Sequence, residues 1–362
     1  MPHHVEVQMR LTIKTLTLLW TGGVDGKVDR IHETGILGSL RWWYEVIVRG
    51  LGGKACDPTS NDRCKYDPRD SRPPEEQLCA VCYLFGATGW RRRFRLEVVE
   101  TDVSDAQIDH TISLSNRLYT DYKGNQRAPT WYFRDPTQSG EPKPNTPKQG
   151  RFIIQIQSLT PEFNSQVIAG LIQFIADWAS LGARAQMGFG VIALPSGRID
   201  TQPLYDWLIR AAGHCTYTDL PSLRNIFLAR ISPKNDKPFS EQDTFNLKYD
   251  LRRLFANNER VRHFIMGTAK CKRIAAKVKM SRPYNNAKEM RVWGWIPEEA
   301  KVYQGSWDRN KVVNAIYHYL KRSYNVQVWR EMNASRDTVT PNNDALAFLR
   351  SLLGLREEDH AA

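Results

Sequence analysis

Several classes of protein are excluded by what this sequence lacks. It has no apolar run of about eighteen residues, so neither a transmembrane helix nor a membrane partner is expected. Its first residues lack the basic-then-apolar pattern of an export signal, which favours the cytoplasm. It also lacks a Gly-x-x-x-x-Gly-Lys-Ser/Thr phosphate loop and the Gly-x-Ser-x-Gly elbow of serine hydrolases, so neither enzyme class is favoured.

Acidic residues are scarce relative to basic ones. The 362 residues include 51 Lys and Arg but only 39 Asp and Glu, a formal net charge of +12. This excess favours a polyanionic partner, RNA or DNA before an acidic membrane surface. With 41% hydrophobic and 25% charged residues the chain can bury a core, and its length suits about two domains of roughly 100–200 residues.

Acids are scarcest between residues 248 and 291. This window holds thirteen Lys and Arg against three acids, so it carries +10 of the net charge. A solvated face, the alternative interpretation, would normally intersperse acids among the bases. The window therefore predicts contact with phosphates. The expected contacts are Lys270, Lys272, Arg273, Lys277 and Lys279.

Hydrophobic periodicity in the first two hundred residues alternates between strand and helix. Alternating apolar residues predict strands near 5–13, 94–98, 152–156 and 191–194, and helical spacing predicts helices at 36–51 and 167–178. The resulting order, strand-helix-strand-strand-helix-strand, is that of the ferredoxin-like fold. Many RNA-binding modules share it.

The pattern after residue 200 is weaker but compatible with a second such unit. A strand is expected at 223–229, a helix at 241–256, extended segments at 264–280 and 290–296, and helices at 311–324 and 345–353. We therefore predict an α+β protein of two ferredoxin-like domains, residues 1–200 and a basic 201–362. The first domain carries two inserts, at 52–84 and 102–150.

Cysteines are few, and four of the six fall in the first insert, at Cys56, Cys64, Cys79 and Cys82. Four thiolates form the closed tetrahedral set that structural zinc prefers. The second pair has the two-residue gap of a zinc knuckle, whereas the seven-residue gap of the first pair is unusual. A zinc ion would hold together an insert too poor in apolar residues to fold alone. Free cysteines or a redox pair are the alternatives, and Cys215 and Cys271 lie apart.

The glycine-rich segment GARAQMGFG at 182–190, after the second predicted helix, and the long insert between strands two and three resemble the RAMP superfamily of CRISPR proteins. Within it, LLWTGGVDG at 18–26, GSLRWWY at 38–44 and LFGAT at 84–88 resemble the Cmr subunit-one family of type III-B effector complexes. That resemblance implies an RNA-binding subunit without its own active site, at the head of the ribonucleoprotein. Its expected partners are guide crRNA, target RNA and other Cmr-type subunits, with cutting left to the repeated backbone subunits.

Glycines and arginines are the candidate RNA contacts in the first domain. Glycines let a backbone approach a phosphate and present N–H groups, with Arg184 adding charge; the alternative is an ordinary tight turn. Arg41 is expected to face RNA, while Trp43 of the same helix faces the core. The full set is Gly22, Gly23, Lys27, Arg41, Arg91, Arg93, Gly182, Arg184, Gly188 and Gly190.

The polar insert at 102–150 combines aromatic and basic side chains. Bases stack on aromatic rings and phosphates need cations, so the insert is interpreted as a thumb that contacts RNA or a neighbouring subunit. The alternative is a small aromatic cluster under the loop. The residues chosen are Tyr119, Lys123, Arg127, Trp131 and Arg134.

Two aspartates, Asp25 and Asp29, leave an enzymatic alternative open. They follow the first strand, where a RAMP endoribonuclease would use a carboxylate to cleave target or precursor guide RNA. The alternative, ordinary turn chemistry at 24–26, is favoured because the subunit that the sequence resembles is not the one that cuts. The histidines, His32 among them, show no pairing typical of acid–base catalysis. A third interpretation, a zinc-dependent DNA-binding protein, lacks a recognition helix.

Overall fold

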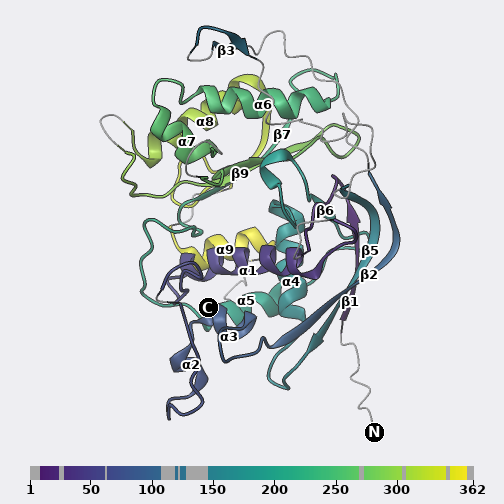
Figure 1. The fold of residues 1–362 in the computed structure, drawn as a ribbon, viewed down its shortest axis with the longest axis vertical. Coiled ribbons are helices and arrows are strands. Elements are labelled where there is room, and N and C mark those ends of the chain that lie inside the picture. The colour runs from purple at the N-terminus through teal and green to yellow at the C-terminus, as the bar shows by residue number, and fades with distance from the viewer. Residues whose placement is uncertain are drawn as a thin grey trace.

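The computed structural model describes residues 9–23, 28–61, 63–106, 119–120, 123–127, 146–268, 273–303, 307–339 and 343–356. Within them the chain forms two four-stranded sheets with helices packed against both (Figure 1). The predicted α+β class with two ferredoxin-like domains is confirmed.

The first sheet repeats the predicted order of elements. It consists of β1 (Met9–Thr15), β2 (Phe94–Asp105), β5 (Lys148–Ser158) and β6 (Ile192–Ala193), with α1 (Glu33–Gly50) and α4 (Gln166–Trp178) between them. The strands lie in the order β2-β5-β1-β6, and every neighbour is antiparallel. Alternation along β1 buries Leu11 and Ile13 with the helices, where Ile13 pairs with Phe152 of β5.

The second sheet has the same topology. It contains β7 (Ile226–Ser232), β8 (Val278–Met280), β9 (Met290–Trp295) and β10 (Asn325–Arg330), in the order β10-β7-β9-β8. Helices α6 (Glu241–Arg253) and α7 (Glu259–Met266) connect the first two strands, and α8 (Arg309–Ser323) precedes the last. The predicted extended segment at 264–280 is wrong for 264–266, because α7 continues until Gly267, whose φ of +76° ends it.

Both faces of the second sheet are buried. On β7, Phe227 and Ala229 pack into a core with α6, α7 and α8, whereas Ile226 and Leu228 belong to the core of the first domain. The first domain therefore covers one face of the second sheet and the helices of the second domain cover the other. This layering fixes the two units against each other.

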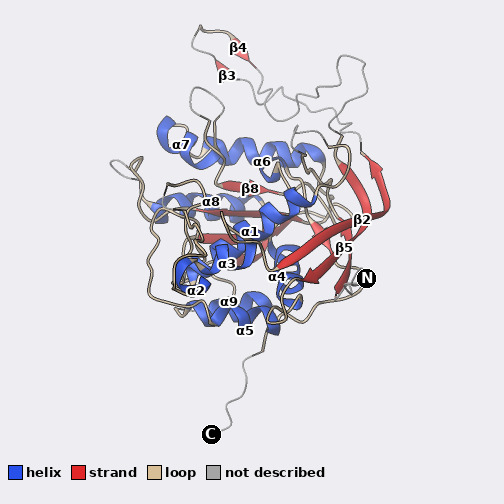
Figure 2. Cartoon of the chain, turned by 60° about the horizontal axis from the view of Figure 1, so that its bottom comes forward, coloured by secondary structure: helices blue, strands red, loops and turns tan. Residues whose placement is uncertain are grey.

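Two further helices complete the first core. Helix α5 (Gln202–Ile209) follows the first domain, and α9 (Ala345–Leu353) comes from the end of the described chain. Both contribute to the same apolar cluster as α1 and α4. Figure 1 shows α9 beside α1, and Figure 2 shows α5 and α9 on the side opposite α6 and α7.

The two inserts differ in how much of them is regular. The first contains α2 (Pro74–Gln77) and α3 (Ala80–Phe85). The ends of the second are paired strand, because β2 runs to Asp105 and β5 begins at Lys148. Between them lies the short pair β3 (Tyr119–Thr120) and β4 (Gln126–Arg127).

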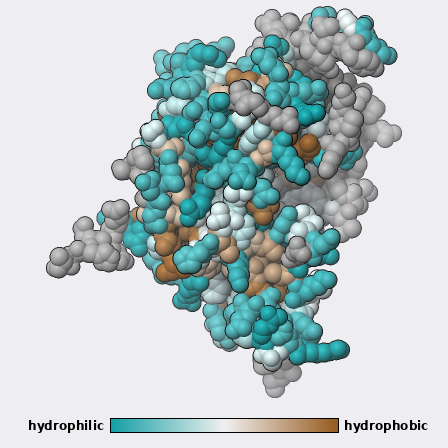
Figure 3. All heavy atoms as spheres, turned by 90° about the vertical axis from the view of Figure 1, so that its left-hand side faces the viewer, coloured by the Kyte–Doolittle hydropathy of each residue, from teal (hydrophilic) through white to brown (hydrophobic). Residues whose placement is uncertain are grey.

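The face drawn in Figure 3 is mostly hydrophilic, with apolar residues gathered in its lower half. None of the helices in the described part of the chain is both long and apolar enough to span a bilayer.

Candidate nucleic-acid interface and metal centre

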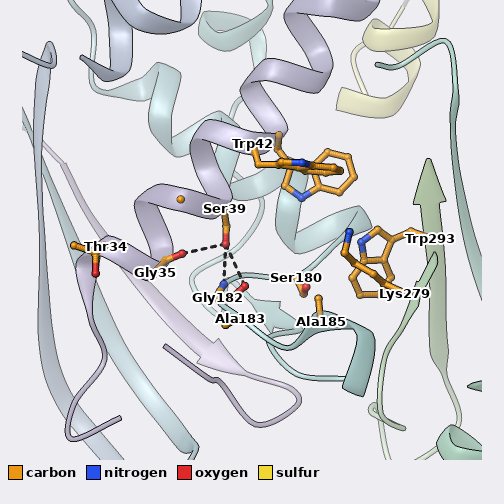
Figure 4. Close-up of a pocket in the computed structure, with 12 residues that line it drawn as sticks. Thr34, Gly35, Ser39, Trp42, Ser180, Gly182, Ala183, Ala185, Lys279 and Trp293 are labelled. Carbon is orange, nitrogen blue, oxygen red and sulfur yellow. Dashed lines mark hydrogen bonds between the residues drawn. The ribbon is translucent and has the colours of Figure 1, made fainter. Parts of the chain in front are cut away.

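A cavity of about 370 Å³ opens between the two units. The first half of α1, the loop after α4 and strands β8 and β9 line it (Figure 4). Its lining includes Ser39, Trp42, Ser180, Gly182, Lys279 and Trp293, and none of the described residues around it is acidic. We call it the interdomain cavity.

Ser39 of α1 holds the glycine-rich loop against the helix. The Gly182 N–H donates to Ser39 Oγ at 2.9 Å, and the Ser39 hydroxyl donates to the Gly35 carbonyl oxygen at 3.1 Å (Figure 4). Gly182 has a φ of +78°, and a Cβ there would lie 2.4 Å from the Trp20 carbonyl oxygen. Only glycine fits, so the first glycine of the motif fixes one wall of the cavity.

The backbone N–H groups of these glycines have partners inside the protein, and their contact with phosphates stays a prediction. Besides the bond at Gly182, the Gly188 N–H donates to the Ala185 carbonyl oxygen at 3.2 Å and the Gly190 N–H to that of Leu18 at 2.8 Å. Gly188 and Gly190 are buried and have φ values of +93° and +90°. The glycines thus serve close backbone packing, the ordinary-turn alternative.

Arg184 is the exposed cation of this loop. Its guanidinium carbon lies 3.5 Å from the centroid of the Trp20 ring, and its backbone is left-handed with a φ of +58°. It makes no ion pair with any described residue. Its role as a phosphate contact stays a prediction.

Lys279 brings a positive charge to the cavity. Its Nζ lies 4.9 Å from the centroid of the Trp42 ring, and Trp42 meets Trp43 edge to face at 4.7 Å. Burial lowers the pKa of Lys279 to about 8. Within the described residues the ammonium has neither a hydrogen bond nor an ion pair. An aromatic surface beside an unpaired cation suits a single-stranded nucleic acid.

Much of the basic window at 248–291 is used inside the protein. Lys277 is buried and donates to the Phe264 carbonyl oxygen at 3.1 Å, and its contact with phosphate stays a prediction. The other buried cations of the window are Lys248, Arg282 and Arg291. Of the remaining predicted contacts Arg273 is exposed, while Lys270 and Lys272 lie outside the described residues.

The four predicted cysteines converge. All four Sγ atoms lie within 4.8 Å of one another, with Cys56 to Cys82 at 3.5 Å and Cys56 to Cys79 at 3.8 Å. A tetrahedral ion about 2.3 Å from each sulfur separates the sulfurs by about 3.8 Å, so the set can hold a metal ion. Hydrogen bonds from the Cys56 and Cys82 thiols lower the pKa of Cys79, which favours a thiolate ligand there.

Backbone and side-chain donors surround the sulfurs. The Cys79 N–H donates to Cys64 Sγ at 3.3 Å and the Cys82 N–H to Cys79 Sγ at 3.4 Å. Arg41 Nη2 donates to Cys82 Sγ at 3.3 Å, and Nη1 to the Gly86 carbonyl oxygen at 3.0 Å. Such donors stabilise coordinated thiolates. Arg41 thus faces the cysteine cluster rather than a free surface, and RNA contact by it stays a prediction.

The first residues of this insert are hydrogen-bonded to α1 and to Tyr217, which lies in the segment between α5 and β7. The buried Arg49 guanidinium donates to the Cys56 carbonyl oxygen at 3.0 Å. The Tyr217 hydroxyl donates to the Gly53 carbonyl oxygen at 3.1 Å and accepts from the Ala55 N–H at 3.0 Å. The cluster is therefore anchored at both α1 and the segment between α5 and β7.

The other predicted RNA contacts lie apart from the cavity lining. The Arg93 guanidinium stacks over the Tyr83 ring at 4.2 Å and the Trp90 ring at 4.7 Å, and Arg91 is exposed. Gly22 and Gly23 are half-buried, and Lys27 lies outside the described residues. Their RNA contacts stay predictions.

Asp29 forms a pair that the sequence reasoning missed. Its carboxylate lies 2.6 Å from His32 Nε2, and this hydrogen bond lowers the pKa of Asp29. The Asp29 side chain is 70% exposed and that of His32 13%. Their three-residue spacing just before α1 was the available signal. Asp25 lies outside the described residues.

The predicted thumb is described only in part. Tyr119 and Arg127 pair in the β3–β4 hairpin, and Lys123 lies exposed in its turn. Trp131 and Arg134 lie outside the described residues.

Comparisons with known proteins place the chain in a family. No curated protein matches its sequence. The structure of Cmr1 from Pyrococcus furiosus (apo form) is similar, with 13% identity and a TM-score of 0.47, covering 86% of this chain and 96% of that one. A chain of type III-B Cmr-beta bound to cognate target RNA shows 12% identity and a TM-score of 0.42, covering 86% of this chain and 98% of the other. The model of the RAMP superfamily matches residues 12–193, just over half of the sequence, so this chain belongs to the RAMP superfamily.

Proposed function

We propose that this protein is an RNA-binding subunit at the head of a type III-B CRISPR effector complex, without cleavage activity of its own. The observation that carries the proposal is the interdomain cavity, in which Trp42 and the unpaired Lys279 meet on a RAMP fold. Aromatic rings interleaved with cations suit single-stranded RNA of any sequence. The exposed Arg184, two residues from Gly182, adds a second cation near the cavity.

The ligands are guide crRNA and target RNA, and the partners are other Cmr-type subunits. The resemblance of residues 18–26, 38–44 and 84–88 to the Cmr subunit-one family supports this place in the complex. The net charge of +12 supports a polyanionic ligand.

The metal of the four-cysteine cluster is zinc in a structural role. A Cys₄ set leaves no open coordination position for a substrate. It would join the two ends of an insert whose second half, with Leu78 and Val81, already packs in the first core, and Arg41 partly balances its negative charge.

An endoribonuclease is the second candidate, and the Asp29–His32 pair is the observation that favours it. A carboxylate that orients an imidazole can make it a general base toward a ribose 2′-hydroxyl. The pair lies at the N-terminal end of α1, the helix whose next residues line the interdomain cavity.

RNA binding is tested with labelled single-stranded RNA and duplex DNA of equal length. We expect tighter binding of single-stranded RNA, with a log–log salt slope of about −0.7 per phosphate neutralised. Lys279→Met and Arg184→Met should each weaken binding and flatten the slope. The matched control is Lys311→Met, an exposed lysine on α8, which covers the opposite face of the second sheet. A flat salt dependence, or preference for duplex DNA, contradicts the proposal.

A further inference from the structure

We propose that the interdomain cavity receives one unstacked nucleobase of the bound RNA, held against Trp42 and hydrogen-bonded by Ser180 and Lys279. This inference rests on the proposed function and deepens it, because it separates a base-dependent contact from the charge that holds the backbone. It concerns the described cavity alone.

The size of the cavity suits one nucleotide. Its volume of about 370 Å³ falls near the lower end of pockets that enclose small ligands, roughly 300–1,000 Å³. Its walls come from three segments that lie far apart in the chain (Figure 4). A strand passing its mouth could place a single base inside.

The aromatic wall is already positioned. Trp42 is half-buried and rests edge to face on Trp43, which itself packs on Phe174 at 5.3 Å. Trp293, 2% exposed, adds a second indole from β9. A ring held in one orientation loses little entropy when a base stacks on it, so it is a better platform than a mobile surface side chain.

The polar groups of the cavity have unused hydrogen-bonding capacity. Ser180 is only 6% exposed, and within the described residues its hydroxyl has no hydrogen-bond partner. The oxygen is still accessible from the cavity, so a ligand that enters can form a hydrogen bond with it. Lys279 is likewise unpaired, and the described lining contains no carboxylate that could neutralise it or repel a phosphate. A base edge offers an acceptor to Lys279 and either role to Ser180.

Other ligand classes fit this lining less well. A metal ion would need carboxylates, thiols or imidazoles, and none of these lines the described cavity. A purely aliphatic ligand would leave Ser180 and Lys279 unpaired. A nucleobase uses the aromatic wall and both polar groups, whether it belongs to an RNA strand or to a free nucleotide.

The experiment compares two single strands of equal length and charge, one of ordinary RNA and one whose bases are absent. The proposed function predicts that both bind with the same salt slope. The inference predicts that ordinary RNA binds about 5- to 100-fold more tightly, the range for stacking one base on an aromatic side chain. Equal affinities would overturn the inference and leave RNA binding intact, whereas failure of both strands to bind would refute the proposed function itself.

Variants locate the base-dependent part. Trp42→Ala and Ser180→Ala should reduce the preference for ordinary RNA while leaving the affinity for the abasic strand unchanged. Ser180→Ala removes one oxygen and keeps the packing, so it decides the matter if Trp42→Ala does not fold. The control is Trp307→Ala, another half-buried tryptophan, which packs on Phe255 in the second core. A preference that survives Ser180→Ala and Trp42→Ala would overturn the assignment to this cavity.

Binding of a free nucleoside monophosphate tests whether the base in the cavity belongs to an RNA strand or to a free nucleotide. It should quench tryptophan fluorescence weakly, in a manner that Ser180→Ala reduces, and RNA should displace it. Binding of the monophosphate that RNA does not displace would assign the cavity to a free nucleotide and overturn the inference.

Discussion

Arg291 of β9 donates from Nη2 to the carbonyl oxygen of Ala176, 2.7 Å away at the end of α4. The same guanidinium donates to the Ala179 carbonyl oxygen at 3.0 Å and, from Nε, to the Tyr284 hydroxyl at 3.0 Å. Arg291 is 5% exposed, so a residue of the second domain supplies the positive charge and donors that the C-terminus of a first-domain helix needs. The loop that begins at Ser180 starts from this anchored end.

Replacing Arg291 should therefore loosen the junction between the domains. Arg291→Met leaves three acceptors without their buried donor, and we expect a loss of about 3 kcal/mol in the free energy of unfolding. Chemical denaturation measures it. Arg253→Met, an exposed arginine of α6, is the control and should change stability by less than about 0.5 kcal/mol. Equal stability of the two variants would show that the contact contributes nothing.

Arg291 also shows where sequence reasoning reaches its limit. The order of elements in the first domain was predictable, because apolar periodicity along β1, α1 or α4 is local. In the second domain the sequence pattern missed α7 and the last strand, β10. The same pattern counts Arg291 as basic surface, since nothing local reveals that α4 of the first domain covers it, and it counts Lys277 as surface although α7 covers that side chain. Which face of a strand is covered depends on tertiary packing.

The candidate sites divide in the same way. The four cysteines were predictable, because their residue type carries the chemistry and they fall in one short insert. The interdomain cavity was not, because it joins Ser39, Ser180 and Lys279 from three distant segments. The sequence predicts Gly182 and Lys279 as separate phosphate contacts, but it does not show that both residues line the same cavity.

The cysteine cluster should contain one zinc ion per chain. Metal analysis of protein purified without chelator should find about one equivalent, as expected for a four-ligand structural site. Cys79→Ser should lose the metal and make residues 56–82 sensitive to protease, because the insert depends on it. Cys215→Ser, a half-buried cysteine outside the cluster, should keep the full equivalent. Zinc retained by Cys79→Ser would exclude this ligand set.

RNA affinity should fall as the pH rises through the pKa of Lys279, about 8. The Lys279 ammonium loses its charge near pH 8 rather than near the ordinary lysine pKa of 10.5. We therefore expect the affinity for RNA to fall about tenfold between pH 7 and pH 9. Lys277, which directly precedes strand β8, also has a pKa lowered to about 8, but it is paired with a carbonyl oxygen. Lys279→Met should therefore abolish this pH step, which binding measured at constant ionic strength would reveal.

The free energy of unfolding should rise with pH between about pH 8 and pH 10.5, whereas RNA affinity falls as Lys279 loses its charge. Above about pH 8 the folded state has released the Lys279 proton, whereas the unfolded chain keeps it until about pH 10.5, so the unfolded state binds more protons and stability rises with pH. Lys279→Met should reduce that rise. A wild-type and variant protein with identical pH profiles would show that Lys279 is not desolvated.

The Asp29–His32 pair distinguishes a binding subunit from a nuclease. If the protein only binds RNA, Asp29→Asn and wild type leave labelled RNA uncut with or without divalent metal. If the second candidate is right, wild type cleaves and both Asp29→Asn and His32→Ala reduce the rate at least about 100-fold, the usual contribution of a general base. His32 also precedes α1, so RNA affinity measured in parallel controls for damage to the fold.

Gly182 should tolerate no side chain, for two separable reasons. Its φ of +78° strains any other residue, and a Cβ would lie 2.4 Å from the Trp20 carbonyl oxygen. Gly197, with a φ of +105° and nothing within 4 Å of its Cβ position, carries the strain without the collision. We expect Gly197→Ala to cost about 1 kcal/mol. Gly182→Ala should cost about 1–3 kcal/mol more, because backbone must move to admit the methyl group.

Gly182→Ala should also weaken RNA binding, since the loop that moves is a wall of the interdomain cavity. Similar losses of stability in the two variants would mean that the loop yields freely, and the cavity would then not be the rigid recess that its contacts with α1 indicate.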